Sequence, residues 1–248
     1  MVDIRELIKK NQQRWDAMTL LPARKAGVQI RANVIFQNKA RFQTAADLLH
    51  SKGYAQPPWW FIGIAAEREA GVPHCFECQL AQGDPLGKVS THEPAGRGPF
   101  FGPDAFERSC LDALIDCPPH AALWHDWTPG GVATIFEEYN GLGYAGRGVP
   151  SAYVWSGSDQ YVSGKYVADH VYRASAVDVQ EGCMPLLKAL EAYDPTITTS
   201  FMTSVPAGPL APPLLPKTLP QLPHLTVATP ASPHPSIWEI LLNTIKAM

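Results

Sequence analysis

The most apolar run in the chain, "PPWWFIGIAAEREAG" at residues 57–71, ends on two glutamates, Glu67 and Glu69. Pro57 and Pro58 suit the first turn of a helix, and the residues after them are apolar on every side as far as Glu67. A helix of this kind belongs at the centre of a folded core. A carboxyl group at its end must pair, reach water or stay partly protonated, and a partly protonated carboxyl group can serve as a general acid.

The two glutamates are not equivalent. Residues two apart on a helix point about 200° from each other, so we expect one of the pair to face solvent. Periodicity alone does not choose between Glu67 and Glu69. The alternative is that both belong to an ordinary charged helix end.

Apolar residues recur at helical spacing on both sides of this run, which predicts a mainly helical domain. Capping and stop residues set the approximate limits of the helices. The predicted helical ranges are 2–18, 28–53, 57–71, 103–117, 128–141 and 177–194.

Residues 75–103, "CFECQLAQGDPLGKVSTHEPAGRGPFFGP", differ from this pattern because they are rich in Gly and Pro. Short extended runs flank the turn signal Gly83-Asp84-Pro85, which predicts a small β-hairpin or an irregular lobe. The expected fold class is therefore α+β, mainly α, with a small β-hairpin lobe.

The composition changes again near residue 200. Ten of the 24 prolines lie between Pro206 and Pro235, with few charges among them. We expect a domain over 1–200, a Pro-rich linker over 201–235 and a short amphipathic helix over 236–248. That helix could dock on the domain or fray, pair with a partner, or touch a membrane surface.

Bulk composition excludes several classes of function. Twenty Lys and Arg against 23 Asp and Glu give a net charge of −3, so nothing indicates a nucleic-acid partner. The charged N-terminus lacks the apolar core of a signal peptide, and the apolar stretch at 54–66 is too short to span a bilayer. We expect synthesis in the cytoplasm without a signal peptide and no stable membrane insertion.

The five cysteines indicate neither a disulfide framework nor, by themselves, a cofactor. Their odd number argues against paired disulfides. A four-thiolate zinc site built from Cys75, Cys78, Cys110 and Cys117 is an alternative to buried free thiols, but the spacing of the second pair is loose for it. His120 and His125 have no carboxylate-rich spacing typical of a metal site, and we predict no metal and no cofactor.

Four blocks in order along residues 3–190 resemble a family of phage and prophage peptidoglycan hydrolases with a lysozyme-like fold. The blocks are "PPWWFIGIAAEREAG", "LAQGDPLGKVSTHEPAGRGPF", "EEYNGLGY" and "PSAYVWSGSDQYVSGKYVAD". The third is also similar to the Tyr-Asn block of lytic transglycosylases and goose-type lysozymes. The resemblance implies cleavage of the β-1,4 bond between N-acetylmuramic acid and N-acetylglucosamine.

The resemblance also selects among the candidate residues. It aligns Glu69, not Glu67, with the family's catalytic acid, and it places Ala66 where that family has a histidine. Asp84 follows on the proposed hairpin, where it could face the acid across a cleft or simply favour the turn. Aromatic rings and amides suit sugar rings. The expected substrate contacts are Gln82, His92, Tyr139, Asn140, Tyr153, Trp155, Gln160 and Tyr161.

Two chemical outcomes and two rival functions stay open. Attack by water would make a muramidase, and attack by the muramyl 6-hydroxyl would make a lytic transglycosylase. A non-catalytic wall-binding or virion structural protein could keep the same fold. A zinc-dependent amidase or peptidase is not supported by any H-E-x-x-H motif. The expected partner is the glycan strand of the bacterial cell wall, reached after release through the membrane with the help of a holin.

Overall fold

The computed structural model describes residues 2–54, 57–168 and 170–203. The chain divides into two units, Met1–Pro209 and Leu210–Met248, and the described residues all belong to the first. The predicted terminal helix, 236–248, and the predicted linker beyond residue 203 lie outside the described residues.

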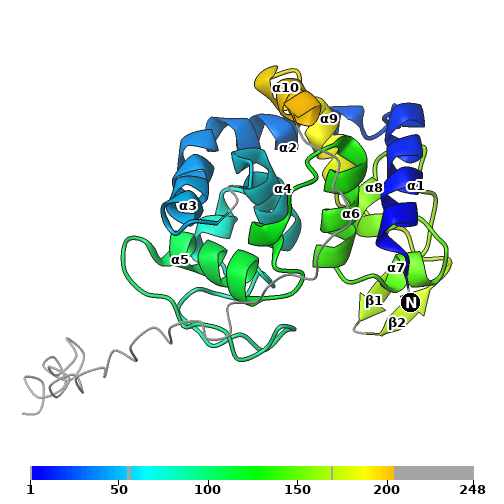
Figure 1. The fold of residues 1–248 in the computed structure, drawn as a ribbon. Helices are drawn as coiled ribbons and strands as arrows, with labels where there is room; N and C mark the ends of the chain where they lie inside the picture. Colours follow the sequence, from blue (N-terminus) through cyan, green and yellow to red (C-terminus); the bar gives the residue numbers. More distant parts are fainter. Residues whose placement is uncertain (1, 55–56, 169, 204–248) are drawn as a thin grey trace, which may run out of the picture. The chain divides into compact units, whose positions relative to one another are not determined.

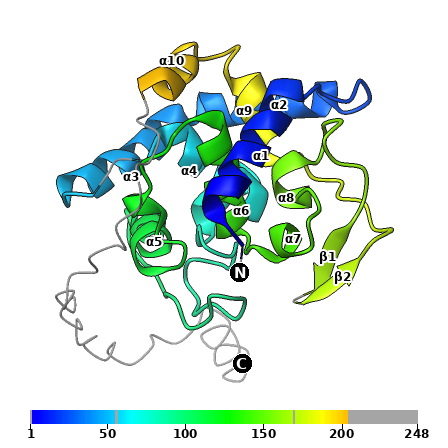
Figure 2. The same cartoon turned by 45° about the vertical axis from the view of Figure 1, so that its right-hand side comes forward.

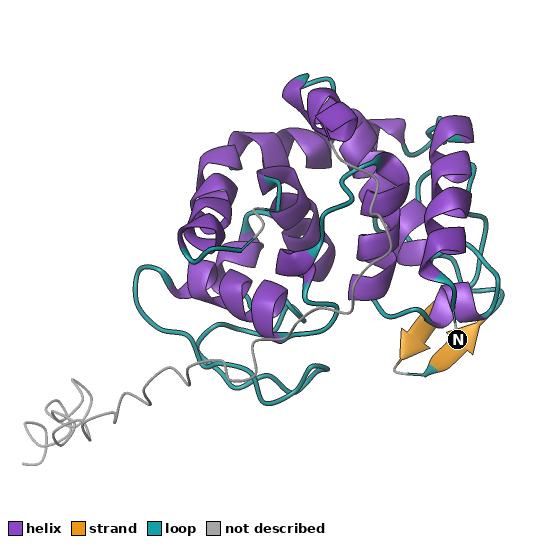
Figure 3. Cartoon of the chain, in the orientation of Figure 1, coloured by secondary structure: helices purple, strands orange, loops and turns teal. Residues whose placement is uncertain are grey.

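The first unit is mainly helical with one small antiparallel hairpin, which confirms the expected fold class (Figure 1, Figure 3). The α-helices are α1 (Ile4–Ala17), α2 (Lys25–Gln37), α3 (Lys39–Ser51), α4 (Trp59–Glu69), α5 (Ala105–Leu111), α6 (Pro129–Tyr139), α7 (Gly143–Gly146), α8 (Ala152–Trp155), α9 (Cys183–Leu190) and α10 (Thr196–Thr203). The strands are β1 (Lys165–Ala168) and β2 (Val171–Arg173).

Helix α4 is the central helix, as its composition predicts. Every residue from Trp59 to Ala66 is buried, and α4 packs against α2, α3 and α9. Phe61 stacks on Phe136 of α6 with ring centroids 4.5 Å apart. Gly63 lets α2 and α3 approach α4 closely, because a Cβ at Gly63 would lie 2.7 Å from the Ile35 side chain. The helix ends at Glu69, which lines a cavity.

The helix predicted over 28–53 is instead two helices, α2 and α3, which meet at Asn38. The Asn38 backbone leaves the helical region at φ −100° and ψ 11°. Its side-chain amide donates to the carbonyl oxygen of Val34 at 2.9 Å. An asparagine offers the backbone such an alternative to the helical ladder, and continuous apolar periodicity hides the break.

The hairpin is not where the turn signal indicates. Residues 74–103 form the irregular lobe that was the alternative: a 3-10 turn at His74–Glu77, one isolated bridge between Cys78 and Pro85, and otherwise loops. The strands come later in the chain: Tyr166 of β1 pairs with Tyr172 of β2, and a bulge follows Tyr166. Alternating β-branched and aromatic residues favour pairing, whereas dense Gly and Pro remove hydrogen-bond donors and weaken strands.

The hairpin lies beside α7 (Figure 1, Figure 2). Three tyrosine rings join the two elements edge to face: Tyr144 of α7 lies 5.1 Å from Tyr166 and 6.2 Å from Tyr172. The Tyr144 hydroxyl accepts a hydrogen bond from the Tyr166 backbone N–H at 3.2 Å. The hairpin is therefore fixed to the helical body, and it forms one wall of a cavity at the end of α4.

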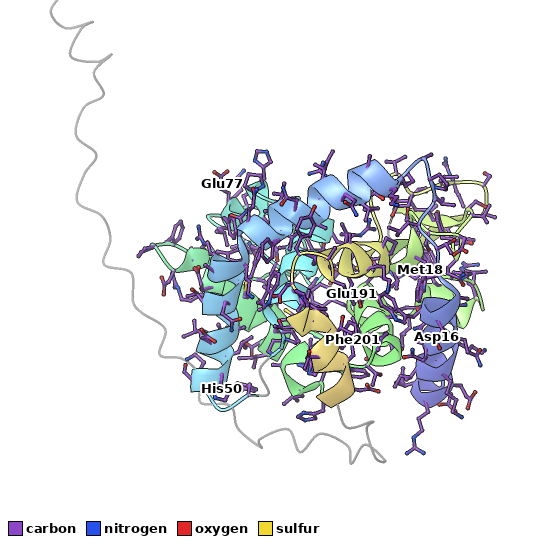
Figure 4. The ribbon with its side chains drawn as sticks, turned by 90° about the horizontal axis from the view of Figure 1, so that it is seen from above. Asp16, Met18, His50, Glu77, Glu191 and Phe201 are labelled. Atoms are coloured by element: carbon purple, nitrogen blue, oxygen red, sulfur yellow. The ribbon has the colours of Figure 1, made fainter. Side chains whose placement is uncertain are left out.

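Helix α10 packs on the upper side of the helical unit, which Figure 4 shows from above. Its Phe201 ring contacts Trp15 of α1 and Trp60 of α4 edge to face, each at 6.1 Å between centroids. The packed unit therefore extends past residue 200, where the sequence predicts the linker to begin. Among the described residues, no helix is both long enough and apolar enough to cross a membrane.

Candidate active site

The C-terminal end of α4 opens into a cavity of about 850 Å³, and Glu69 lies in its wall. The other walls come from the end of α6, from α7, from the hairpin and from the segment before α9. These elements are distant in the sequence, and only the fold brings them together. The lining residues include Arg68, Glu69, Glu93, Glu138, Tyr139, Asn140, Tyr144, Tyr153, Lys165, Tyr166, His170, Asp178 and Gln180.

Among the described residues, one side-chain hydrogen bond holds Glu69. The Tyr153 hydroxyl, from α8, donates to Glu69 Oε1 at 2.8 Å. Burial raises the pKa of Glu69 to about 7, although the Tyr153 hydrogen bond and the charge of Arg68 both act to lower it. A carboxyl group with a pKa near 7 is populated in both protonation states at neutral pH, which is what proton transfer to a substrate requires.

Arg68, the residue before Glu69, points to a buried ionic cluster. Its guanidinium lies 2.9 Å from Asp178 Oδ2, and the two side chains are 5% and 1% exposed. Lys165 of β1 lies 2.7 Å from the other oxygen, Asp178 Oδ1. Burial alone would raise the pKa of Asp178, but the charges and hydrogen bonds of Arg68 and Lys165 hold it below its ordinary value. The cluster joins α4, the hairpin and the segment before α9.

Glu67 occupies a different position from Glu69. It lines a second cavity of about 560 Å³, which shares Arg68, Glu69 and Gln180 with the first. Its Oε2 accepts the backbone N–H of Val72 at 2.7 Å, and its Oε1 lies 3.5 Å from Arg31. Neither glutamate simply faces solvent, which corrects the expectation from helical geometry, because the chain after α4 folds back over Glu67.

Tyr139 and Asn140, at the end of α6, lie in the wall of the larger cavity as predicted. The Tyr139 hydroxyl donates to the carbonyl oxygen of Leu80 at 2.8 Å, which attaches α6 to the loop that follows α4. Asn140 is exposed and ends the helix, so its amide is available to a ligand.

Asp84 is close to Glu69 along the chain, but its side chain forms hydrogen bonds within its own loop. Its Oδ2 accepts the backbone N–H groups of Thr91 and His92 at 2.8 and 3.2 Å, and its Oδ1 lies 2.8 Å from His92 Nδ1. Asp84 does not line either cavity. Gly83 has φ +70°, and a Cβ there would lie 2.5 Å from the Glu69 carbonyl oxygen, so backbone rather than carboxylate meets the end of α4.

Gln82 and His92 also belong to this loop. The Gln82 side-chain amide donates to the carbonyl oxygen of Pro94 at 2.8 Å, and Pro94 lines the larger cavity. Gln82 therefore shapes the rim without lining it. The His92 side chain is 71% exposed and lies outside both cavities.

The residues expected from "YVWSGSDQY" separate into two groups. Tyr153 holds Glu69, whereas Trp155 is fully buried in the core. The Tyr161 hydroxyl accepts the backbone N–H of Asp178 at 3.0 Å, and Gln160 donates to its neighbour Asp159 at 3.0 Å. Trp155, Gln160 and Tyr161 do not line the larger cavity, because Trp155 packs into the core and the other two lie after α8, where they bond to Asp159 and Asp178.

Sequence reasoning missed Arg68, Asp178, Lys165 and Glu138 as lining residues. A signal for Arg68 does exist: a charged residue in a helix that is otherwise apolar on every side needs a buried counter-charge. No comparable signal marks Asp178, which lies in an irregular segment.

Within the described residues, no three His, Cys, Asp or Glu side chains are placed to hold a metal ion. The cysteines considered for zinc are free thiols, and Cys75, Cys110 and Cys117 are buried. Comparison with protein-family models, with curated proteins and with solved structures finds no match to this chain.

Proposed function

We propose that this chain is a peptidoglycan-cleaving glycosidase in which Glu69 is the general acid. The observation that carries the proposal is the environment of Glu69. Its carboxyl group ends a buried apolar helix, lies in a cavity of about 850 Å³, and has a pKa raised to about 7. The four sequence blocks that resemble phage peptidoglycan hydrolases support the choice of substrate.

The surroundings of Glu69 suit a chain-like substrate. A glycan cleaved within its length must extend to both sides of the proton donor. Glu69 lines both cavities, together with Arg68 and Gln180, and we propose that the glycan lies in the larger one. A volume of about 850 Å³ is within the range of pockets that bind small molecules.

In the proposed reaction Glu69 gives its proton to the glycosidic oxygen as the bond from that oxygen to the muramyl C1 breaks. The bonding electron pair leaves with the oxygen, and positive charge develops on the sugar ring. Water or the muramyl 6-hydroxyl then attacks C1 and returns a proton to the Glu69 carboxylate. The proposed steps assign no role to Asp84, because it lines neither cavity and its oxygens are bonded to Thr91 and His92.

The test is mass analysis of the products released from purified peptidoglycan. We expect the protein to release muropeptides, and Glu69→Gln to slow their release by about 10²–10⁴-fold with the fold unchanged. Glu67→Gln is the matched control, because Glu67 ends the same helix but is bonded to Val72, and it should retain activity. Reducing ends would identify hydrolysis, and 1,6-anhydromuramyl ends would identify transglycosylation.

Two results would contradict the proposal. A purified protein that binds the wall and releases no muropeptide would be the non-catalytic wall-binding protein that the sequence leaves open. Loss of activity in Glu67→Gln but not in Glu69→Gln would show that the acid is misassigned.

A further inference from the structure

Asp178 lies at the centre of the ionic cluster behind Glu69 and is fixed from several sides. Its Oδ1 and Oδ2 meet Lys165 and Arg68 at 2.7 and 2.9 Å. Its backbone N–H donates to the Tyr161 hydroxyl at 3.0 Å, and its carbonyl oxygen accepts from the Ser156 hydroxyl at 2.9 Å. A carboxylate held in this way has one position, and it imposes that position on both cations.

Arg68 carries this constraint to the acid. Its Nη1 donates to the carbonyl oxygen of Glu181 at 3.0 Å, and its guanidinium carbon lies 4.6 Å from the centre of the Tyr153 ring. Tyr153 in turn donates to Glu69 Oε1 at 2.8 Å. A continuous series of contacts therefore runs from Asp178 through Arg68 and Tyr153 to the Glu69 carboxyl group.

We propose that Asp178 is a positioning residue for Glu69: it neutralises and orients Arg68, and thereby sets the orientation and the charge environment of the acid. The inference rests on the proposed role of Glu69. Without Asp178, the buried positive charge of Arg68 beside Glu69 would be uncompensated and would favour the ionised carboxylate, the form that cannot donate a proton.

A purely structural role for the same ion pair makes a different prediction. Loss of a buried pair lowers stability wherever it occurs, but it changes the pKa of Glu69 only if the pair acts on Glu69. Among the described residues, the titratable or charged groups that interact electrostatically with Glu69 include Arg68, Tyr139, Tyr153 and Cys183. Those that interact with Asp178 in the same part of the chain include Arg68, Tyr144, Tyr161, Lys165 and Cys183.

Two substitutions should move the pKa of Glu69 in opposite directions. Asp178→Asn should lower it by about half a unit to one unit, since Arg68 then acts on Glu69 without compensation. Lys165→Met should raise it by less than about half a unit, because the Lys165 side chain is 33% exposed and therefore partly screened. In an Arg68→Gln background the effect of Asp178→Asn should become smaller, because only the direct effect of the Asp178 charge on Glu69 then remains.

The experiment is a carbon NMR titration of the Glu69 carboxyl group in the full chain, with the signal assigned by its loss in Glu69→Gln. The matched control is Asp194→Asn. Asp194 is 6% exposed and lies 2.7 Å from Lys39, but it lines neither cavity. Asp194→Asn should lower the melting temperature and leave the pKa of Glu69 unchanged.

An unchanged Glu69 pKa in folded Asp178→Asn, or one unchanged or lowered in Lys165→Met, overturns the proposal. Lys165→Met decides the question if Asp178→Asn does not fold. Peptidoglycan release by the same proteins separates this inference from the proposed function. Opposite shifts in a protein that releases no muropeptide would support the positioning of Glu69 and refute the glycosidase.

Discussion

Removing the Tyr153 hydroxyl tests how the protein tunes its proposed acid. Tyr153→Phe keeps the ring that Arg68 covers and deletes only the donor that lies 2.8 Å from Glu69 Oε1. That hydrogen bond favours the ionised carboxylate and lowers its pKa. Its loss should therefore raise the pKa of Glu69 and extend activity to higher pH.

The size of the shift follows from the strength of the bond. A hydrogen bond to a charged group is worth about 1.5–3 kcal/mol, and a bond between neutral groups about 1 kcal/mol. Tyr153 can bond either form of Glu69, so the difference is about 0.5–2 kcal/mol, and the middle of this range corresponds to about one pKa unit. The pKa of Glu69 should rise from about 7 to roughly 8.

The assay is the initial rate of muropeptide release between about pH 5 and pH 9, fitted for the basic limb of the profile. A general acid must be protonated, so activity is present below its pKa and is lost above it. At pH 8 the unmodified protein should keep about a tenth of its maximal rate and Tyr153→Phe about half of its own maximum. Tyr139→Phe is the control, because its hydroxyl bonds Leu80 and its removal should leave the limb in place.

Two outcomes would refute this reasoning. A basic limb that stays near pH 7 in a folded Tyr153→Phe protein would show that the bond does not control the acid. If the basic limb moves to lower pH, the group whose deprotonation ends activity is not Glu69.

Two further predictions concern other carboxyl groups. Glu137 is fully buried, and burial raises its pKa to about 7, so the free energy of unfolding should fall as pH rises from about 4.5 to about 7. Glu137→Gln should remove this loss and stabilise the fold at pH 8 by about 1–3 kcal/mol, which thermal unfolding at pH 5 and pH 8 measures. Asp84→Asn should keep most of the peptidoglycan-cleaving activity, because an amide oxygen can still accept hydrogen bonds from Thr91 and His92. A large loss of turnover with an unchanged melting temperature would instead show that Asp84 has a catalytic role.

The sequence was most informative where one strong physical term dominates. A run that is apolar on every side has no stable place except a core, so residues 57–71 predict a buried helix and a carboxyl group where that helix ends. Helical spacing likewise predicts most of the other helices. Choosing Glu69 over Glu67 needed the resemblance to a family, since periodicity treats the two alike.

Prediction fails where weak local preferences compete. The Gly83-Asp84-Pro85 signal marks a real turn, but a turn does not specify whether the segments beside it pair, and the hairpin forms at 165–173 instead. In the same way, the break at Asn38 depends on one side-chain hydrogen bond within a long apolar pattern.

Only the tertiary structure decides which polar groups surround Glu69. Arg68, Tyr153 and Asp178 are far apart in the chain, and no spacing rule joins them. Their meeting depends on how α4, α8 and the segment before α9 pack, and once they are buried, each charge must find a partner. The sequence alone therefore determined the core helix and the carboxyl groups at its end, while the packing of distant segments determined the pKa and the orientation of Glu69, because burial and counter-charge are properties of the folded neighbourhood.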